Sequence, residues 1–257
     1  MAELHLISWN VNGIRAAERK GFLDWLAKTG ADVVAVQETK ASPDQLSPAL
    51  LNPPGYFSAW NAAEKKGYSG VVTYSRETPR AVRTGLADPR FDGDGRVLVT
   101  EFEPFTLFNI YFPNGGRGPQ WVQHKIDFYD RFLEIVASYV AEGRPLVVTG
   151  DVNTAFAEID LARPKENAKT SGFLPEERAA LGRFFDAGLV DTFRLVRPEE
   201  VKYSWWDQRS FARQKGLGWR IDYFFVSPDL KERVIDADIH SEVEGSDHAP
   251  VSLRLEV

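Results

Sequence analysis

The sequence contains no cysteine among its 257 residues. Disulfide bonds, thiolate nucleophiles and cysteine-ligated metal centres are therefore excluded, and any metal must be held by oxygen or imidazole ligands. The chain also lacks an apolar run of the ~18 residues that a membrane-spanning helix needs. Its start, MAELHLISWN, has neither a basic segment nor a long apolar one. We therefore expect a cytoplasmic protein that makes no membrane contact.

Positive charge is in slight deficit, because 31 Lys and Arg stand against 37 Asp and Glu and give a net charge of −6. This balance argues against a protein that coats nucleic acid through its overall charge, but it allows a local basic groove. It also allows acidic residues gathered at a divalent cation, which can face an anionic substrate across the metal. Net charge alone leaves both interpretations open.

Hydrophobic residues make up 43% of the chain and aromatic residues 12%. A chain of this length buries roughly 75% of its unfolded surface, so this content is enough for a substantial core and excludes disordered and fibrous proteins. The sequence shows no low-complexity tract, long linker or periodic repeat that would divide it. We therefore predict a single domain over residues 1–257.

Short apolar runs rich in β-branched and aromatic residues predict strands along the whole chain. They are residues 4–9, 32–37, 69–75, 96–103, 105–112, 145–150, 221–227 and 250–257. Helical patterns lie between some of them, at 15–30, 121–143 and 175–187. Because βαβ units mix with antiparallel-looking hairpins such as 96–112, the order favours an α/β fold with two sheets and helices outside them.

Two of the predicted strands end in similar short polar sequences. NVNG (10–13) follows the strand at 4–9, and DVNT (151–154) follows the strand at 145–150. Both place two polar side chains, two positions apart, just past a strand end. In open α/β sheets ligands bind at that edge, so both segments are candidates for a binding site.

Further acids follow or interrupt apolar runs, namely Glu38, Asp222 and Asp247. A single residue of this kind is more often a turn former or helix N-cap than a ligand. Several such residues in one chain make a metal site the better interpretation. Mg²⁺ needs oxygen ligands and retains several waters, so one or two carboxylates plus a substrate phosphate are enough to bind it. Glu38 is the best ligand candidate.

Of the four histidines, His248 lies in a polar, turn-like segment beside Asp247. His5, His124 and His240 have strand-like or helical surroundings, which favour packing or surface roles. An Asp elsewhere in the fold could hold the His248 ring in one tautomer and favour its charged form. His248 is therefore the histidine that we expect to carry chemistry.

Three segments, 111–118, 205–209 and 213–220, interleave Arg and Lys with Trp, Tyr and Gly. Such loops can follow a phosphate backbone and offer flat surfaces to bases. Taken one at a time, however, tryptophans are mostly packing residues and Gly/Arg loops are mostly solvated turns. These segments therefore indicate nucleic-acid binding only when they are considered together with the other motifs.

Seven segments, taken together, resemble the exonuclease III family of apurinic/apyrimidinic (AP) endonucleases. They are SWNVNGIRA (8–16), QETK (37–40), IYFPNGGRG (110–118), GDVNTA (150–155), EIDLARPKENAKTSGFLPEER (158–178), GWRIDYFFVS (218–227) and GSDHAP (245–250). Their order and separations make the joint match far more specific than any single motif. The resemblance implies a four-layer α/β sandwich, in which two packed mixed β-sheets are flanked by helices as in deoxyribonuclease I, with the site at one edge of the sheets.

The resemblance also implies roles for individual residues. Mg²⁺, which Mn²⁺ could replace, would lie among Asn10, Asn12, Glu38, Asp151, Asn153, Asp247 and His248. The attacking water would be positioned or deprotonated by Asp151 and oriented by Asn153. The scissile phosphate would contact Tyr111 and His248, and Asp222 would support the histidine. Substrate binding would fall to Asn114, Arg117, Trp205 and Trp219, the tryptophans lining a pocket for an extrahelical abasic sugar.

Three positions depart from the pattern of some relatives. Asn12 stands where some have Asp, which removes one negative charge and would weaken Mg²⁺ binding. Phe156 replaces a histidine found in many members, and Thr170 stands where some have Asn. These two replacements bear on fine substrate preference.

The function implied is a Mg²⁺-dependent, monomeric DNA-repair nuclease. It would cut duplex DNA 5′ to abasic sites, leave a 3′-hydroxyl, and trim 3′ ends or act as a 3′–5′ exonuclease. Phosphodiester hydrolysis needs an aligned water, a base and positive charge at the phosphoryl oxygens, and the candidate residues can supply all three.

Two alternatives stay open. One is a phosphodiesterase of the same fold acting on inositol phosphates, lipids or RNA, which the RPKEN and GWR segments disfavour. The other is an inactive nucleic-acid-binding module, which is disfavoured because each expected acid, Asn and His is present. The sequence does not rank abasic cleavage, exonuclease activity and action on a deaminated base such as uracil.

Overall fold

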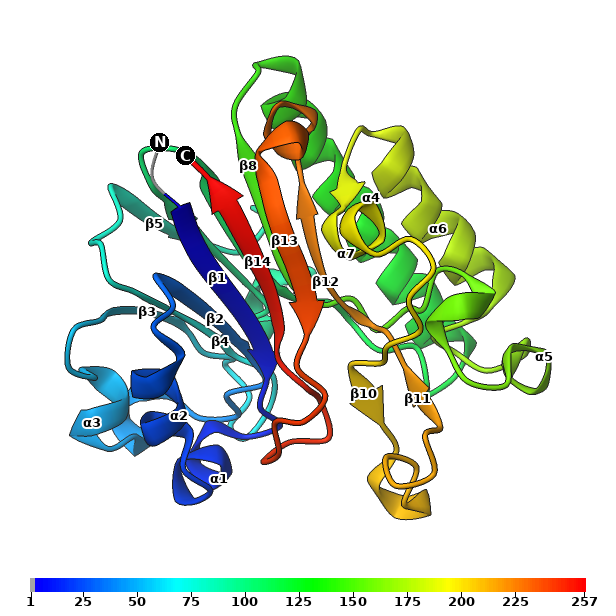
Figure 1. Ribbon diagram of the computed structural model, residues 1–257, viewed down its shortest axis with the longest axis horizontal. Coiled ribbons are helices and arrows are strands. Elements are labelled where there is room, and N and C mark those ends of the chain that lie inside the picture. Colours follow the sequence, from blue (N-terminus) through cyan, green and yellow to red (C-terminus); the bar gives the residue numbers. More distant parts are fainter. Residues whose placement is uncertain (1–2) are drawn as a thin grey trace.

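A computed structural model describes residues 3–257, the side chain of Arg209 excepted. Two six-stranded sheets pack face to face (Figure 1). The strands of the first, in spatial order, are β13 (Val234–Ile239), β14 (Val251–Glu256), β1 (Glu3–Asn10), β2 (Val33–Gln37), β4 (Val71–Ser75) and β3 (Phe57–Asn61). Those of the second are β5 (Ala81–Thr84), β6 (Val97–Glu101), β7 (Thr106–Tyr111), β8 (Leu146–Asp151), β12 (Asp222–Val226) and β9 (Val190–Asp191). Both sheets are mixed, with β1–β2 and β7–β8 parallel.

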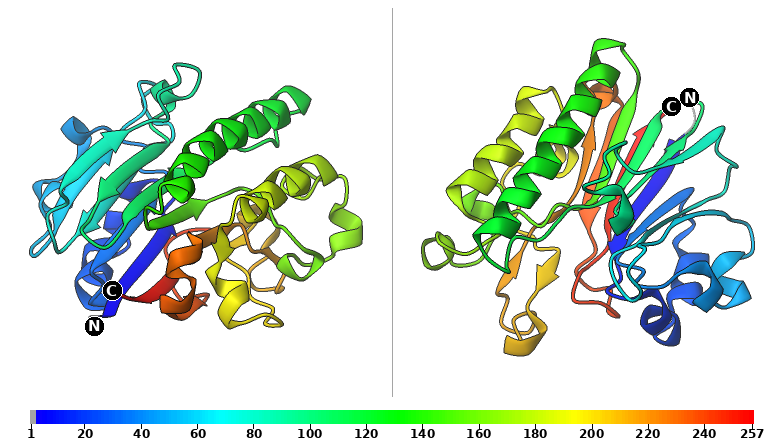
Figure 2. Two further views of the ribbon diagram at one scale, coloured as in Figure 1. Left: turned by 90° about the horizontal axis from the view of Figure 1, so that it is seen from above. Right: turned by 180° about the vertical axis from the view of Figure 1, so that it is seen from behind.

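Helices cover the outer face of each sheet (Figure 2). The first sheet packs against α1 (Ile14–Arg19), α2 (Phe22–Thr29) and α3 (Pro48–Leu51). The second packs against α4 (Pro119–Ala141) and α6 (Pro175–Asp186). Between the sheets, Leu6, Leu253, Leu107, Val147 and Phe224 belong to one buried apolar cluster. The predicted four-layer α/β sandwich is therefore confirmed.

Shorter elements decorate this frame. The remaining helices are α5 (Pro164–Asn167) and α7 (Thr192–Val196), with 3₁₀ turns η1 (Pro43–Gln45), η2 (Asp92–Asp94), η3 (Glu158–Asp160), η4 (Gln208–Ser210) and η5 (Pro228–Arg233). Strands β10 (Trp205–Trp206) and β11 (Gly218–Trp219) pair antiparallel and project below the sheets in Figure 1. Among residues 3–257, no helix is long and apolar enough to cross a membrane.

The predicted strands are all present, but the helix predicted over 15–30 is wrong as a single element. The structure has α1 and α2 there, separated at Lys20 and Gly21. Gly21 adopts φ 96°, a left-handed backbone that glycine allows at little cost and that ends a helical path. The amphipathic pattern continued across this break because both short helices bury one face on the same sheet.

The sequence did not predict the four edge strands of the two large sheets, β3, β5, β9 and β13. It did not predict the two-residue strands β10 and β11 either. Only one residue of β3, Ala59, is buried, and none of β5 is. Edge strands are partly solvated, so they lack the continuous apolar run by which the central strands were recognised.

The strand register brings the predicted site residues to one edge of the sandwich. On the second sheet Tyr111 pairs with Asp151, and Asp151 pairs with Asp222 on the neighbouring strand. The first sheet reaches the same edge, because the Nδ2 of Asn10, the last residue of β1, lies 2.8 Å from Oδ2 of Asp151. The ends of β1, β7 and β8 and the start of β12 therefore meet.

Candidate active site

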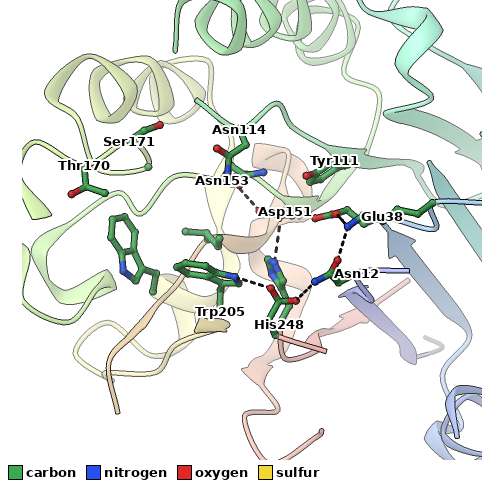
Figure 3. A pocket seen from close by; sticks show the side chains of 15 residues that line it. Asn12, Glu38, Tyr111, Asn114, Asp151, Asn153, Thr170, Ser171, Trp205 and His248 are labelled. Carbon is green, nitrogen blue, oxygen red and sulfur yellow. Dashed lines mark hydrogen bonds and ion pairs between the residues drawn. The ribbon is translucent and has the colours of Figure 1, made fainter. Parts of the chain in front are cut away.

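A cavity of about 360 Å³ opens at this edge (Figure 3). Glu38 and Asn12 lie on one side of it, Trp205 and Thr170 on the other, and Asp151 between them. Of the residues predicted to form the site, the following line it: Asn12, Glu38, Tyr111, Asn114, Asp151, Asn153, Trp205, Trp219, Asp247 and His248. Asn10, Arg117 and Asp222 do not.

The two similar polar segments form the same local turn. The backbone N–H of Asn12 donates to Oδ1 of Asn10 at 3.0 Å, and that of Asn153 donates to Oδ1 of Asp151 at 2.9 Å. Asn12 and Asn153 adopt positive φ angles of 48° and 57°, which asparagine tolerates better than most residues. Each turn folds the chain back at a strand end and aims its second polar side chain into the cavity.

Asn10 forms hydrogen bonds with two acids, Glu38 and Asp151. Its fully buried amide Nδ2 donates to Oε1 of Glu38 and to Oδ2 of Asp151, both at 2.8 Å. Its Oδ1 already accepts the Asn12 N–H. The contacts therefore show a residue that holds Glu38 and Asp151 together, and its role as a metal ligand stays a prediction.

Asp151 is surrounded by other carboxylates. Burial raises the pKa of its carboxyl; His248 opposes this effect, whereas Asp222 and Glu38 add to it. Glu38, Asp151 and His248 each offer one ligand atom, and these atoms lie within 4.8 Å of one another. Carboxylate oxygens crowded in this way are donors that fit a hard divalent cation.

Two side chains flank this group on the solvent side. Lys40 Nζ lies 2.6 Å from Oε2 of Glu38, and Asn12 Nδ2 donates to Oδ1 of Asp247 at 3.0 Å. Burial opposes the charged form of Asp247, but His248 and the hydrogen bonds from Asn12 and Trp205 hold its pKa below the usual range. Asp247 therefore adds a negative charge at the mouth of the cavity.

His248 is oriented by Asp222. Its Nδ1 lies 2.9 Å from Oδ2 of Asp222, which also accepts a 2.6 Å bond from Ser204 Oγ, and its Nε2 lies 3.8 Å from Oδ2 of Asp151. Burial disfavours the imidazolium, but the carboxylates of Asp222 and Asp151 outweigh burial and raise the pKa of His248 to about 10. At neutral pH the ring is thus a cation with Nε2 directed at the acids.

The roof of the cavity carries amide and phenol groups. Asn114 Nδ2 donates to Oδ1 of Asn153 at 2.8 Å, and Asn153 Nδ2 donates to the carbonyl of Phe112 at 2.9 Å. Burial, together with the nearby carboxylates of Glu38 and Asp151, raises the pKa of the Tyr111 hydroxyl well above the ordinary value. Tyr111 therefore stays neutral and keeps a proton to donate.

The far wall is aromatic. Trp205 and Trp219 pair across β10 and β11, with ring centroids 6.3 Å apart and planes at 80°. Gly172 lies against Trp219, and a Cβ built on it would come within 3.2 Å of the Trp219 ring. This wall and Ile221 form an apolar recess beside the charged half of the cavity.

Two residues singled out from the sequence lie elsewhere. Arg117 is exposed, and its Cζ stacks 4.1 Å from the ring centroid of Trp121 on α4, outside the cavity. Phe156 packs edge-on against Phe185, with centroids 4.7 Å apart, and does not line the cavity either. Thr170, the other position at which the sequence departs from some relatives, does line the cavity. Of Phe156 and Thr170, therefore, only Thr170 can touch a ligand there.

Some site residues were not recognised beforehand. Lys40, Ser171, Gly172 and Ile221 line the cavity, and Ser204 bonds Asp222. Lys40 could have been found, because it follows Glu38 by two positions in the QETK segment. Ser204 carried no such signal, because its role depends on a strand 18 residues further along the chain.

The fold and the site together define a hydrolase whose acids and histidine gather at the shared edge of two mixed sheets. The chain belongs to the endonuclease/exonuclease/phosphatase family, whose sequence profile matches residues 7–248. It is 44% identical over 259 residues to an exodeoxyribonuclease of Bacillus subtilis, covering 99% of this chain and 100% of the relative.

Two further relatives support the same grouping. The DNA repair nuclease APEX1 of Danio rerio is 38% identical over 259 residues, covering 100% of this chain and 83% of the relative. The solved structure of an AP endonuclease from Archaeoglobus fulgidus superposes with a TM-score of 0.90 at 28% identity, covering 99% of this chain and 100% of that one. The resemblance inferred from the sequence motifs is thereby confirmed.

Proposed function

We propose that this chain is a DNA-repair nuclease that hydrolyses the phosphodiester 5′ to abasic sites in duplex DNA, leaving a 3′-hydroxyl, and that also trims 3′ ends. The observation that carries the proposal is the single cavity in which Glu38, Asp151 and His248 face the recess formed by Trp205 and Trp219. Relatives that are an exodeoxyribonuclease, a DNA repair nuclease and an AP endonuclease support it. We propose a monomer as the active form.

The side chains divide the chemistry among them. Asp151, buried at 1% exposure and held by Asn10, would orient the attacking water and take its proton. The His248 imidazolium, fixed by Asp222, would place its Nε2 proton against a phosphoryl oxygen. Mg²⁺, for which Mn²⁺ could substitute, would lie among Glu38, Asp151 and the adjoining Asn12, Asn153 and Asp247, and it would supply positive charge beside the phosphate.

The aromatic recess gives a reason for abasic selectivity. A nucleotide must leave the duplex stack to reach a cavity at the edge of the sheets, and this extrusion costs a few kcal/mol, least where the base is missing. Trp205, Trp219 and Ile221 leave room beside the charged half of the cavity for an apolar ring such as a bare deoxyribose. We therefore propose that the charged half of the cavity binds the phosphate and the apolar recess binds the sugar of one abasic nucleotide.

Three matched duplexes test the function directly. One carries an abasic site, one a uracil and one no lesion, and each is incubated with Mg²⁺ and with EDTA. We expect one cut 5′ to the abasic site, a 3′-hydroxyl product and no cut in EDTA. An enzyme that removes 3′ nucleotides but leaves the internal abasic site intact would contradict the endonuclease proposal, and cleavage in EDTA would contradict the metal.

Glu38→Gln is expected to raise the Mg²⁺ concentration that gives half-maximal activity by about 10-fold or more. The substitution keeps the size of a side chain that bonds Asn10 but removes a negative charge from the acid cluster. A Mg²⁺ titration of initial rates measures the effect, and Glu142→Gln, exposed at the end of α4, is the control. Normal cutting at limiting Mg²⁺ would remove Glu38 from the metal site.

Trp219→Ala is expected to reduce kcat/KM on abasic DNA by about 10-fold or more, with a much smaller loss on terminal nucleotides. An end can fray into the site without a closely fitting recess, whereas an internal abasic sugar depends on it. Both substrates are compared in steady-state assays. Trp60→Ala, a half-buried tryptophan on β3, is the control. Equal losses on the two substrates would mean that Trp219 acts as general packing.

A further inference from the structure

Arg96 is a charged residue buried next to the active site without lining it. Only 4% of it is exposed, and it immediately precedes β6. Its Nε donates to Oδ2 of Asp94 at 2.9 Å, yet the Asp94 side chain is 35% exposed. Burying a guanidinium is costly unless its donors are satisfied and its charge is paired, so its position calls for further partners.

Those partners are two tyrosines. The Arg96 Cζ lies 4.9 Å from the ring centroid of Tyr111 and 5.3 Å from that of Tyr68. Its Nη1 donates to the carbonyl of Tyr111 at 3.2 Å, and its Nη2 donates to the Tyr68 hydroxyl. A planar guanidinium can stack on rings while its edge donates hydrogen bonds, which a lysine ammonium cannot do.

The backbone around Arg96 is shaped to admit this arrangement. Tyr111 N donates to the Arg96 carbonyl at 2.9 Å, so the two residues are opposite each other across β6 and β7. Gly95 adopts φ 62°, and a Cβ built on it would lie 2.4 Å from the backbone of Ala62. A side chain at position 95 would therefore clash with the backbone at the start of the loop that leads to Tyr68.

We propose that Arg96 is a positioning residue for phosphodiester hydrolysis, which acts by holding the Tyr111 ring so that its hydroxyl faces Glu38 and the phosphate. This inference rests on the proposed function of the cavity. Tyr111 lines the cavity, whereas Arg96 does not line it and contacts the ring and the backbone of Tyr111. Of the contacts of Arg96 given above, only those to Tyr111 reach a residue that lines the cavity, so we expect its effect on the rate to pass through Tyr111.

A double-mutant cycle tests this dependence. Arg96→Gln, Tyr111→Phe and the double variant are compared by kcat and KM on abasic duplex at saturating Mg²⁺. We expect Arg96→Gln to lower kcat by about 10- to 100-fold with little change in KM, because a small misplacement of a catalytic group has effects of this size. In the Tyr111→Phe background the same change should cost less than about 3-fold, the deviation from additivity expected of coupled residues.

Two further variants separate positioning from charge and from folding. Arg90→Gln removes an exposed arginine that stacks on Phe91 at 4.9 Å, and it should leave kcat unchanged. Arg96→Lys keeps the buried charge but loses the stack, and it should remain impaired; it replaces Arg96→Gln in the cycle if that variant does not fold. Losses that multiply in the double variant, or a full rate in Arg96→Lys, would overturn the proposal.

The proposed function and the proposed role of Arg96 are tested by separate measurements, so either can be contradicted without the other. Wild-type cleavage of the abasic duplex decides the proposed function. The ratio among variants decides the role of Arg96, and it can be measured equally on terminal nucleotide removal if that is the reaction the wild type performs. A variant that loses thermal stability but keeps kcat would show that Arg96 is only structural.

Discussion

Asp151→Asn is expected to lower kcat on abasic duplex DNA by about 10³-fold, with little loss of DNA binding. Asparagine has the same size and can still accept the Asn153 N–H that Oδ1 accepts at 2.9 Å. It cannot take a proton from water at neutral pH. The Asp151 carboxylate lies at the centre of the site, 2.8 Å from Asn10 Nδ2 and 3.8 Å from His248 Nε2. We therefore expect no other side chain to replace it as the base.

Single-turnover rates with Mg²⁺ measure the loss, and binding is followed separately with Ca²⁺ in place of Mg²⁺. Asp186→Asn, an exposed acid at the end of α6, is the matched control and should leave the rate unchanged. A variant at position 151 that turns over at a near-normal rate would show that the proton is taken by another group. Loss of binding in parallel with the rate would assign Asp151 to substrate affinity instead.

Lys125→Met is expected to lower the free energy of unfolding by about 3–5 kcal/mol, because it leaves a buried carboxylate without its cation. Lys125 Nζ donates to Oε1 of Glu177 at 2.8 Å and to the Asn153 carbonyl at 2.7 Å, and both ionic side chains are fully buried. Glu177 also accepts bonds from the N–H groups of Gly172 and Leu174. The pair thus ties α4 and α6 to the loop beneath the cavity.

Urea unfolding monitored by circular dichroism gives the free-energy difference. Adding Glu177→Gln to Lys125→Met should recover part of the loss, because the orphaned charge is then removed. Arg183→Met breaks the solvent-exposed pair with Asp130 on the same two helices and should cost less than about 1 kcal/mol. A loss below about 1 kcal/mol for Lys125→Met as well would show that the buried pair is no more stabilising than a surface one.

The central strands could be read from the sequence because their signal is local. Strands β2, β4, β8 and β12 are buried at every residue, so each appears as a continuous apolar run. The edge strands β3 and β5 are half solvated and carry no such run. The division of residues 15–30 into two helices was likewise missed, because an amphipathic pattern does not reveal a left-handed glycine inside it.

The turns that carry the site were also accessible from the sequence. In NVNG and DVNT, the side chain of the first residue accepts a hydrogen bond from the backbone N–H two residues later. This interaction involves only neighbouring residues, so a local sequence pattern can predict it. The motifs around Glu38 and His248 likewise indicated which residues to expect in the cavity. Candidate residue types and their local conformation were therefore determined by the sequence.

Which of these residues touch one another was decided by the tertiary structure. Asn10 meets Asp151 across 141 positions of the chain, and Lys125 meets Glu177 across 52. Such pairs form only when two sheets pack at one register and two helices dock on one face, and no short-range pattern records that geometry. For the same reason the sequence passed over Arg96, because the direction in which a buried polar group points depends on partners that are distant along the chain and close in space.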